Sequence, residues 1–255
     1  MIDLSGKRAF VTGGGRGIGR ATALLLAEAG ARVALGYRQR GTDAEATAAA
    51  VRRLGREARL VPGDLGEPAT AARAVRSAAG AGWDGLDILV VNHGVWVAAE
   101  QPVDRLSDAQ WEETRRANLD SVLYVCRAAI PLLSAGGRIV LVSSTAGQRG
   151  EAFHADYAAT KGAVIAFTKS LAIELAPRDV TVNGVAPGWV DTEMAAEPYA
   201  RDGGRGRQEI ERTIPLGRVA SAADIAGPIV FLCSALARHI TGEILNVNGG
   251  SVLCG

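Results

Sequence analysis

A tyrosine and a lysine stand four positions apart in the stretch "DYAATK", as Tyr157 and Lys161. Residues at this spacing share one face of a helix, so the two side chains can be neighbours. A phenol has an ordinary pKa of about 10, and an adjacent ammonium lowers that pKa by stabilising the phenolate. The pair is therefore a candidate general acid/base, although such a pair on its own is more often simply a helix surface.

A glycine-rich stretch, "VTGGGRGIGRA", follows the first predicted strand and opens a helix. Its glycines allow a tight turn and let backbone N–H groups approach an anion at the positive end of that helix. Because it stands between a strand and a helix, it predicts a dinucleotide site rather than a flexible turn. The residues expected to contact the cofactor here are Thr12, Gly13, Gly15, Arg16, Gly17, Ile18 and Gly19.

The end of the second predicted strand, "RVALGYRQRG", carries no carboxylate where NAD-binding folds place one. Instead Tyr37 is followed by Arg38 and Arg40, and a guanidinium can bind a 2′-phosphate through two hydrogen bonds. This favours NADP(H) over NAD(H), the alternative being that both arginines are solvated surface charges. After the third strand come Asp64 and Leu65, where Asp64 either binds an adenine amino group or caps the next helix.

Short apolar runs alternate with alanine-rich helical stretches along the chain. Continuous apolar runs such as "ILVV" are typical of strands buried on both faces of a parallel sheet. The alternation predicts an α/β fold in a single domain (1–255): a Rossmann-like, doubly wound sheet of about seven parallel strands with helices on both faces. A charged, glycine-rich segment, 193–213, is expected to be a mobile, lid-like excursion. The predicted strands are 8–12, 32–36, 58–61, 88–92, 138–143, 181–186 and 244–247, and the predicted helices are 17–29, 43–54, 67–79, 107–133, 155–176 and 221–236.

The composition excludes several classes of function. The net charge of the 255 residues is +1, which gives no general attraction to nucleic acid or to anionic membranes. No apolar run approaches the roughly 20 residues of a membrane span, and the N-terminus has no signal-peptide pattern, so we expect a cytoplasmic protein. The cysteines Cys126, Cys233 and Cys254 lack metal-ligand spacing and are expected to be reduced and buried, and no metal site is predicted.

Together these motifs resemble the short-chain dehydrogenase/reductase family over essentially the whole chain. The family's Thr-Gly-x-x-x-Gly-x-Gly loop matches Thr12, Gly13, Gly17 and Gly19. The resemblance implies a catalytic set of Asn118, Ser144, Tyr157 and Lys161, with Ser144 rather than Ser143 standing thirteen residues before the tyrosine. It also implies cofactor contacts at Asn92, Gly94, Tyr157, Lys161 and the "PGWVDT" residues Pro187, Gly188, Val190 and Thr192.

One stretch departs from the family pattern. Where the family usually carries Asn-Asn-Ala-Gly, this chain reads "VNHG", with Val91 and His93 replacing an asparagine and an alanine. The departure affects local cofactor contacts and leaves the catalytic set intact. His93 could be catalytic, but a histidine packed beside the cofactor site is the better interpretation.

The resemblance implies reduction of a ketone or 3-oxo group to a secondary alcohol. Tyr157 is expected to donate a proton to the carbonyl oxygen and Ser144 to hold that oxygen. Lys161 is expected to lower the tyrosine pKa and bind the ribose, and Asn118 to hold a water. A non-catalytic nucleotide-binding regulator is a minor alternative, which the complete catalytic set disfavours.

The substrate is less well defined by the sequence. The end of the chain, with "NVNGG", is similar to that of 3-oxoacyl-(acyl-carrier-protein) reductases, which makes a carrier-protein thioester one candidate. Sugars, polyols or small ketones are the alternative. The family usually forms tetramers, which predicts a homotetramer paired through helices 107–133 and 155–176. The expected pocket residues are Val95, Trp96, Gln148, His154 and Trp189, and the arginines that could supply charge to a carrier protein are Arg178, Arg201, Arg205 and Arg207.

Overall fold

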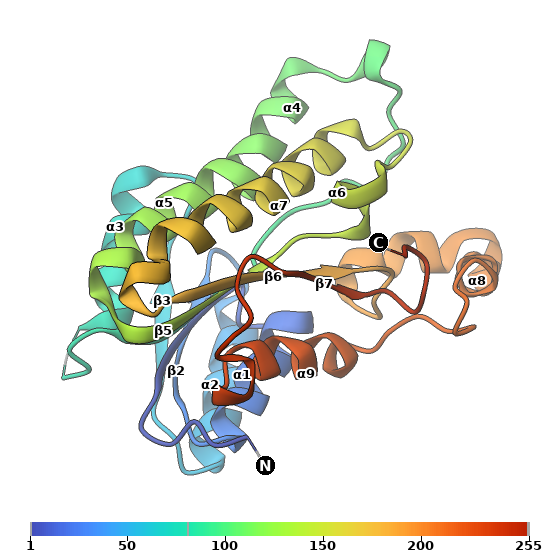
Figure 1. Cartoon of the computed structure of the whole chain (residues 1–255). Coiled ribbons are helices and arrows are strands. Elements are labelled where there is room, and N and C mark those ends of the chain that lie inside the picture. The colour runs from blue at the N-terminus through green and yellow to red at the C-terminus, as the bar shows by residue number, and fades with distance from the viewer. Residues whose placement is uncertain (1, 81, 254–255) are drawn as a thin grey trace.

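The protein is built on one sheet of seven parallel strands in the order β3-β2-β1-β4-β5-β6-β7 (Figure 1). The computed structural model describes residues 2–80 and 82–253. The seven parallel strands confirm the predicted parallel α/β sheet. The strands are β1 (Arg8–Thr12), β2 (Arg32–Tyr37), β3 (Ala58–Pro62), β4 (Leu86–Val91), β5 (Leu133–Val142), β6 (Thr181–Pro187) and β7 (Ile244–Val247).

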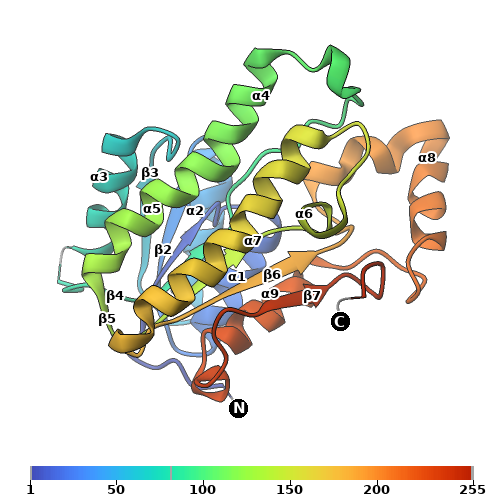
Figure 2. The ribbon, with the colours of Figure 1, turned by 45° about the horizontal axis from the view of Figure 1, so that its top comes forward.

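Helices cover both faces of this sheet (Figure 2). One face carries α3 (Pro68–Ala79), α4 (Asp108–Arg115), α5 (Ser121–Ala129) and α7 (Ala155–Leu175), and the other carries α1 (Gly17–Glu28), α2 (Gly41–Arg53) and α9 (Ala222–Leu232). Successive residues of a strand point to opposite faces, so the apolar run of β4 serves two cores. Leu89 is buried in the core under α3 and α5, and Ile88 in the core under α1 and α9.

The path of the chain creates a binding edge between β1 and β4. It runs outward from β1 to β3 and then returns to β4, which pairs with β1 on the other side. In an open α/β sheet, ligands bind at the carboxyl ends of the strands where the order reverses. The residues that follow β1 and β4 are therefore the expected centre of a site.

Three elements differ from the sequence prediction. The long helix predicted at 107–133 is α4, a π-helical turn η2 (Arg116–Asp120) and α5, and β5 begins earlier than the predicted 138. A short helix α6 (Thr145–Arg149), capped by Ser144, was not predicted. The remaining short turns are η1 (Val103–Arg105), η3 (Ile130–Leu132), η4 (Ala176–Arg178) and η6 (Ala235–Ala237).

The charged segment after β6 is largely helical. It forms η5 (Glu193–Ala195) and α8 (Ala196–Arg212), which lie at one end of the sheet in Figure 1. A kink interrupts α8, because Asp202, Gly203 and Gly204 all have positive φ. At the kink, Arg201 pairs with Glu100 at 3.1 Å and so attaches α8 to the loop after β4. The mobility expected of this segment stays a prediction.

The cysteines follow the expected pattern where the structure describes them. Cys126 and Cys233 are buried and unpaired, and burial raises the pKa of each thiol to about 12. Cys254 lies outside the described residues. Over residues 2–80 and 82–253, none of the helices is long and apolar enough to cross a membrane.

Candidate active site

A cleft of about 360 Å³ opens along the carboxyl edge of the sheet. It gathers nearly all of the residues predicted from the sequence to bind a cofactor or to catalyse. Thr12, Gly19 and Asn118 are buried behind its lining. The predicted residues that line it are Gly13, Gly15, Arg16, Gly17, Ile18, Tyr37, Arg38, Arg40, Asp64, Leu65, Asn92, Gly94, Ser144, Tyr157, Lys161, Pro187, Gly188, Val190 and Thr192.

The glycine loop after β1 is packed too tightly for side chains. Gly13 has φ +64°, and a Cβ placed on Gly19 would lie 2.1 Å from the Gly13 carbonyl oxygen. A Cβ on Gly17 would meet the methyl group of Thr192 at 3.2 Å, so the segment after β6 closes directly over the loop. The loop leads into the N-terminus of α1, which gives the cradle that a pyrophosphate requires.

Tyr157 and Lys161 lie in the first turns of α7 and face the cleft. The Lys161 ammonium lies 5.7 Å from the centre of the Tyr157 ring and donates a hydrogen bond of 2.9 Å to the Val142 carbonyl. Ser144, at the end of β5, hydrogen-bonds with Tyr157. The neighbouring Ser143 is turned away, since its hydroxyl donates to the Lys161 carbonyl at 2.8 Å. The structure thus places Ser144, and not Ser143, beside the tyrosine.

Burial sets the ionisation of the pair. It raises the pKa of Tyr157 to about 12, although hydrogen bonding with Ser144 partly opposes this. Burial also lowers the pKa of Lys161 to about 8. Contrary to the expectation for Lys161, the pKa of Tyr157 is raised rather than lowered, because burial and the negative charge of Glu151 both disfavour the phenolate. At neutral pH the phenol is therefore protonated, which is the form that can donate a proton to a carbonyl oxygen.

Asn118 lies in the π-helical turn and is fully buried. Its side chain accepts a hydrogen bond from the Val95 N–H at 2.7 Å and donates one to the Val95 carbonyl at 2.8 Å. A Cβ on Gly94 would lie 3.0 Å from the Asn118 Oδ1 and 3.5 Å from the Lys161 Nζ. Asn118 is thus an anchor that sets the loop after β4 against the lysine.

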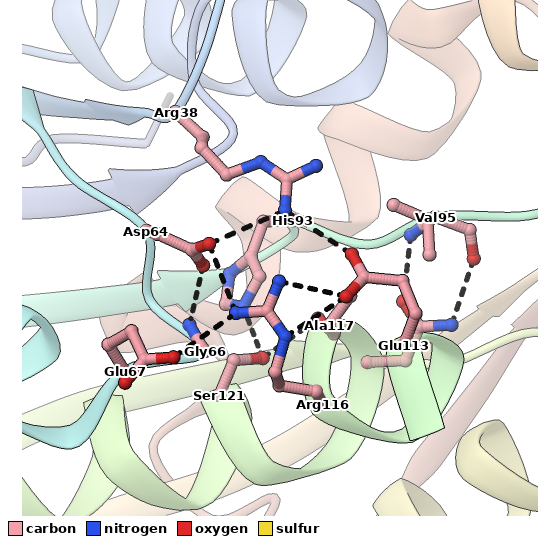
Figure 3. Close-up of polar contacts among 11 residues, drawn as sticks. Arg38, Asp64, Gly66, Glu67, His93, Val95, Glu113, Arg116, Ala117 and Ser121 are labelled. Atoms are coloured by element: carbon pink, nitrogen blue, oxygen red, sulfur yellow. Dashed lines mark hydrogen bonds and ion pairs between the residues drawn. The ribbon is translucent and has the colours of Figure 1, made fainter. Parts of the chain in front are cut away.

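A cluster of charges closes the far end of the cleft (Figure 3). Arg38 lies 3.6 Å from Asp64 and 3.5 Å from Glu113. Arg116, on the π-helical turn, binds Asp64 at 3.0 Å and Glu113 at 2.9 Å. Arg38 is therefore held by two carboxylates at the site predicted for the 2′-phosphate, rather than being free in solvent.

Asp64 does not cap the following helix. The N-cap of α3 is Glu67, whereas Asp64 accepts hydrogen bonds from the Gly66 N–H and from Arg116. Burial raises the pKa of Asp64, but these bonds and the charges of Arg116 and Arg38 outweigh burial and lower the pKa overall. Asp64 is an ionised acceptor at the edge of the cleft, which is compatible with the adenine contact.

The predicted substrate residues divide into two groups. Trp96 and Trp189 line the cleft with their rings edge to face, 5.9 Å apart, and Val95 lies beside them. His154 and Gln148 are not among the residues that line the cleft, and their expected place in the substrate pocket stays a prediction. His154 is buried with its ring 4.8 Å from that of Trp96, and Gln148 donates to Asn246 at 2.6 Å. His154 thus supports the cleft wall from behind at Trp96.

The sequence reasoning missed three residues that line the same end of the cleft. Arg149 and Glu151 belong to the end of α6 and the loop between α6 and α7, and Met194 belongs to η5. Burial raises the pKa of Glu151, and the positive charges of His154 and Arg149 partly oppose this. The only available signal was position, because Arg149 and Glu151 stand just before Tyr157 in the sequence.

The comparisons with known proteins agree with this geometry. A family model described as enoyl-(acyl carrier protein) reductase matches residues 13–251. The 3-oxoacyl-(acyl-carrier-protein) reductase of Aquifex aeolicus is 39% identical over 255 residues, covering 98% of each chain. The chain belongs to the short-chain dehydrogenase/reductase family.

Solved structures of other short-chain dehydrogenase/reductases have the same fold. One from Brucella melitensis, described as a glucose/ribitol dehydrogenase, is 35% identical with a TM-score of 0.91 and covers 99% of each chain. One from Burkholderia cenocepacia, solved in complex with NADP, is 37% identical with a TM-score of 0.89. It covers 97% of this chain, and this chain covers 98% of it. This short-chain dehydrogenase/reductase is thus similar along nearly its full length to oxidoreductases of differing description.

Proposed function

We propose that this short-chain dehydrogenase/reductase uses NADPH to reduce a ketone to a secondary alcohol. One observation carries the proposal: Ser144, Tyr157 and Lys161 meet in the cleft that also holds the glycine loop. The residues fit a dinucleotide, since Gly13, Gly17 and Gly19 leave a cradle that a Cβ would fill. When bound, NADPH would supply the hydride.

The side chains would divide the remaining chemistry among them. Ser144 hydrogen-bonds the carbonyl oxygen and holds it beside Tyr157. Tyr157 donates its proton to that oxygen as the carbon receives the hydride, so that the product is a neutral alcohol. Lys161 offers its ammonium to the ribose hydroxyls and to the tyrosinate left behind. Asn118 keeps Gly94 against Lys161 and, through a bound water, would help to return the proton.

NADP(H) is favoured over NAD(H) by the end of β2. No carboxylate stands there, and Arg38 and Arg40 both line the cleft. Asp64 and Glu113 orient Arg38, as described above. A related structure, from Burkholderia cenocepacia, was solved in complex with NADP.

The first candidate substrate is a 3-oxoacyl thioester. Relatives named 3-oxoacyl-(acyl-carrier-protein) reductase, such as that of Vibrio cholerae at 37% identity, support it. The second candidate is a small free ketone, sugar or polyol. It is favoured because the arginines that could have attracted a carrier protein already have partners within the chain. Arg178 donates to two main-chain carbonyls, while Arg201 and Arg207 form ion pairs with Glu100 and Asp191. Guanidiniums already engaged in this way are poorly placed to attract an acidic carrier protein.

The test is the variant Tyr157→Phe. NADPH oxidation is followed with carrier-protein-linked and free acetoacetyl thioesters and with a panel of ketones and sugars. Loss of the proton donor is expected to lower kcat by about a hundred- to ten-thousandfold, with NADPH affinity nearly unchanged. Tyr124→Phe is the matched control, because Tyr124 is a partly buried tyrosine of α5 that does not line the cleft. Undiminished turnover in Tyr157→Phe would overturn the proposal, and the preferred substrate in the panel decides between the two candidates.

A further inference from the structure

His93 forms a hydrogen-bonded bridge in the wall of the cleft. Its Nδ1 lies 2.7 Å from the Thr12 hydroxyl and its Nε2 lies 2.7 Å from the Ser121 hydroxyl. Both partners are buried. The ring thus joins the end of β1 to the beginning of α5, two elements that are far apart in the sequence. Figure 3 shows the Ser121 side of this bridge.

The neighbouring hydrogen bonds fix which nitrogen carries the proton. The Ser121 hydroxyl donates its own proton to the Ala117 carbonyl at 2.8 Å, so its oxygen must accept from His93. Nε2 is therefore the protonated nitrogen and Nδ1 is the acceptor. The Thr12 hydroxyl supplies the proton to Nδ1, since its other acceptor, the Val90 carbonyl, is farther away at 3.4 Å. Every polar atom in the bridge then has a partner.

The ring is not available as an acid or base. Burial lowers the pKa of His93 to about 3, and the positive charges of Lys161 and Arg38 lower it further, against the opposing charge of Asp64. Both nitrogens are already engaged. The neutral ring is therefore a fixed structural link at every working pH, as the packed-histidine interpretation expected.

The link ends at the turn that carries Asn118. In η2 the Ser121 N–H bonds to the Arg116 carbonyl, one residue further back than in an α-helix. The Ser121 hydroxyl supplies the bond to Ala117 that an α-helical N–H would otherwise make. His93 donates to that same hydroxyl and so supports the π-helical turn from outside. Turns of this kind concentrate at functional sites.

We propose that His93 is a positioning residue: through Ser121 it holds the π-helical turn so that Asn118 and Gly94 stay aligned with Lys161. The loop after β4 is then pinned to the turn at two points, His93 to Ser121 and Val95 to Asn118. Gly94 lies between these points and faces the lysine. The inference rests on the proposed function, because Lys161 and Asn118 matter to turnover only if the site reduces a carbonyl.

Two substitutions separate the halves of the bridge. The glutamine amide nitrogen is as many bonds from Cα as the histidine Nε2, so His93→Gln keeps a donor for Ser121. The asparagine amide oxygen matches Nδ1 instead, so His93→Asn keeps only an acceptor for Thr12. If the contact with Ser121 aligns the site, we expect kcat of His93→Asn to fall about ten- to a hundredfold with KM little changed. His93→Gln is expected to turn over about tenfold faster than His93→Asn.

Ser121→Ala completes the test as a double-mutant cycle. Because His93 is proposed to act through Ser121, the two losses should not multiply. The variant carrying both His93→Asn and Ser121→Ala should be no slower than the slower of the two single variants. Equal rates for His93→Gln and His93→Asn, or multiplicative losses in the double variant, would overturn the inference. Thermal melts and NADPH titrations of each variant identify any that fails to fold or to bind cofactor.

A spectroscopic readout keeps this test apart from that of the proposed function. Nitrogen-15 NMR of the histidine-labelled full chain, assigned with His93→Gln, reports the tautomer without any turnover. We expect an Nε2–H ring that does not titrate through neutral and mildly acidic pH. An Nδ1–H ring or an ordinary titration would refute the bridge even in an active enzyme. Full activity of Tyr157→Phe would instead refute the proposed reaction.

Discussion

At the scale of single residues, the site keeps groups that reduce the stability of the fold. Lys161 is buried, and its ammonium donates a hydrogen bond to the Val142 carbonyl. Burial lowers its pKa from 10.5 to about 8, which means that the folded chain disfavours the charged form. A buried charge with so little compensation is typical of a functional site rather than of a structural ion pair.

Because burial disfavours the charged form of Lys161, we expect the free energy of unfolding to depend on pH. Between about 8 and 10.5 the unfolded chain holds a proton that the folded chain has lost. The contribution of Lys161 to the free energy of unfolding therefore rises with pH across that window and is constant below it. At neutral pH, Lys161→Met is expected to be more stable than the wild type by roughly 1–3 kcal/mol, and this advantage should shrink as the pH rises through the window.

Urea unfolding at a series of pH values measures this difference. Lys169→Met is the matched control, because Lys169 lies on the same helix and is exposed. Subtracting the wild-type curve removes the titration of all other groups. A stability difference that stays constant across the window would contradict the buried, charge-disfavouring site described for Lys161.

The charge cluster around Arg38 makes a second prediction at this scale. Glu113 lies 3.5 Å from Arg38, so it competes with a 2′-phosphate for the guanidinium. Glu113→Gln should therefore strengthen NADPH binding about two- to fivefold, as expected of a half-exposed ion pair, and leave NADH almost unchanged. Arg38→Ala should do the opposite and weaken NADPH more than NADH. Fluorescence titration at low salt, where such pairs are least screened, measures both.

Glu112→Gln is the control for that titration. It removes the same charge from the preceding position of α4. Glu112 takes no part in the cluster of Arg38, Asp64, Glu113 and Arg116. If Glu112→Gln raised NADPH affinity as much as Glu113→Gln, the effect would come from net charge rather than from Arg38. An equal change for NADH would likewise contradict a role at the 2′-phosphate.

At the scale of elements, the glycine loop and α1 form one packed unit. A Cβ on Gly19 would lie 2.1 Å from the Gly13 carbonyl and 2.6 Å from the Asn92 Nδ2. Gly19→Ala must therefore displace the loop or the end of β4, and we expect it to cost about 1–3 kcal/mol and to weaken NADPH binding. In α9, a Cβ placed on Gly227 would meet none of the described neighbours within 4 Å. Gly227→Ala should instead stabilise the protein by about 0.5–1 kcal/mol.

Unfolding and cofactor titration of the two alanine variants test this contrast. Both glycines lie in helices, so helix propensity acts in the same direction and only packing distinguishes them. If Gly19→Ala bound NADPH as well as Gly227→Ala does, the glycine loop would accommodate a Cβ at position 19, contrary to the close contact with the Gly13 carbonyl. The tight turn would then not be what the dinucleotide site requires.

The same elements show what the sequence could and could not predict. The strands and the glycine loop were predictable, because apolar runs and turn residues act locally. The π-helical turn at Asn118 was not, since the turn is in contact with His93, twenty-eight residues from Ser121, and no local pattern indicates that contact. The pairing of Arg38 with Glu113 and the burial that raises the Tyr157 pKa also depend on packing between distant segments.

At the scale of the whole molecule, the outer helices of one face remain open to association. α4 and α5 run end to end through η2, and α7 lies beside them over the sheet (Figure 2). The exposed apolar residues of these helices include Trp111, Leu123 and Ile173. Ile173 is 79% exposed, so a second surface that covered it would remove apolar area from water. The family resemblance predicts that a second copy of the chain does so in a homotetramer.

Charged substitutions on this face test the assembly. Unpaired carboxylates are costly to bury, so the variant carrying Leu123→Glu and Ile173→Glu should lose one interface and sediment as a smaller species than the wild type. Leu54→Glu is the control: Leu54 is also exposed, but it follows α2 on the opposite face of the sheet. A wild type that sediments as a monomer would refute the tetramer itself. A tetramer that survives the double substitution would place the contact elsewhere, because two buried and unpaired carboxylates could not leave a closed helical interface unchanged.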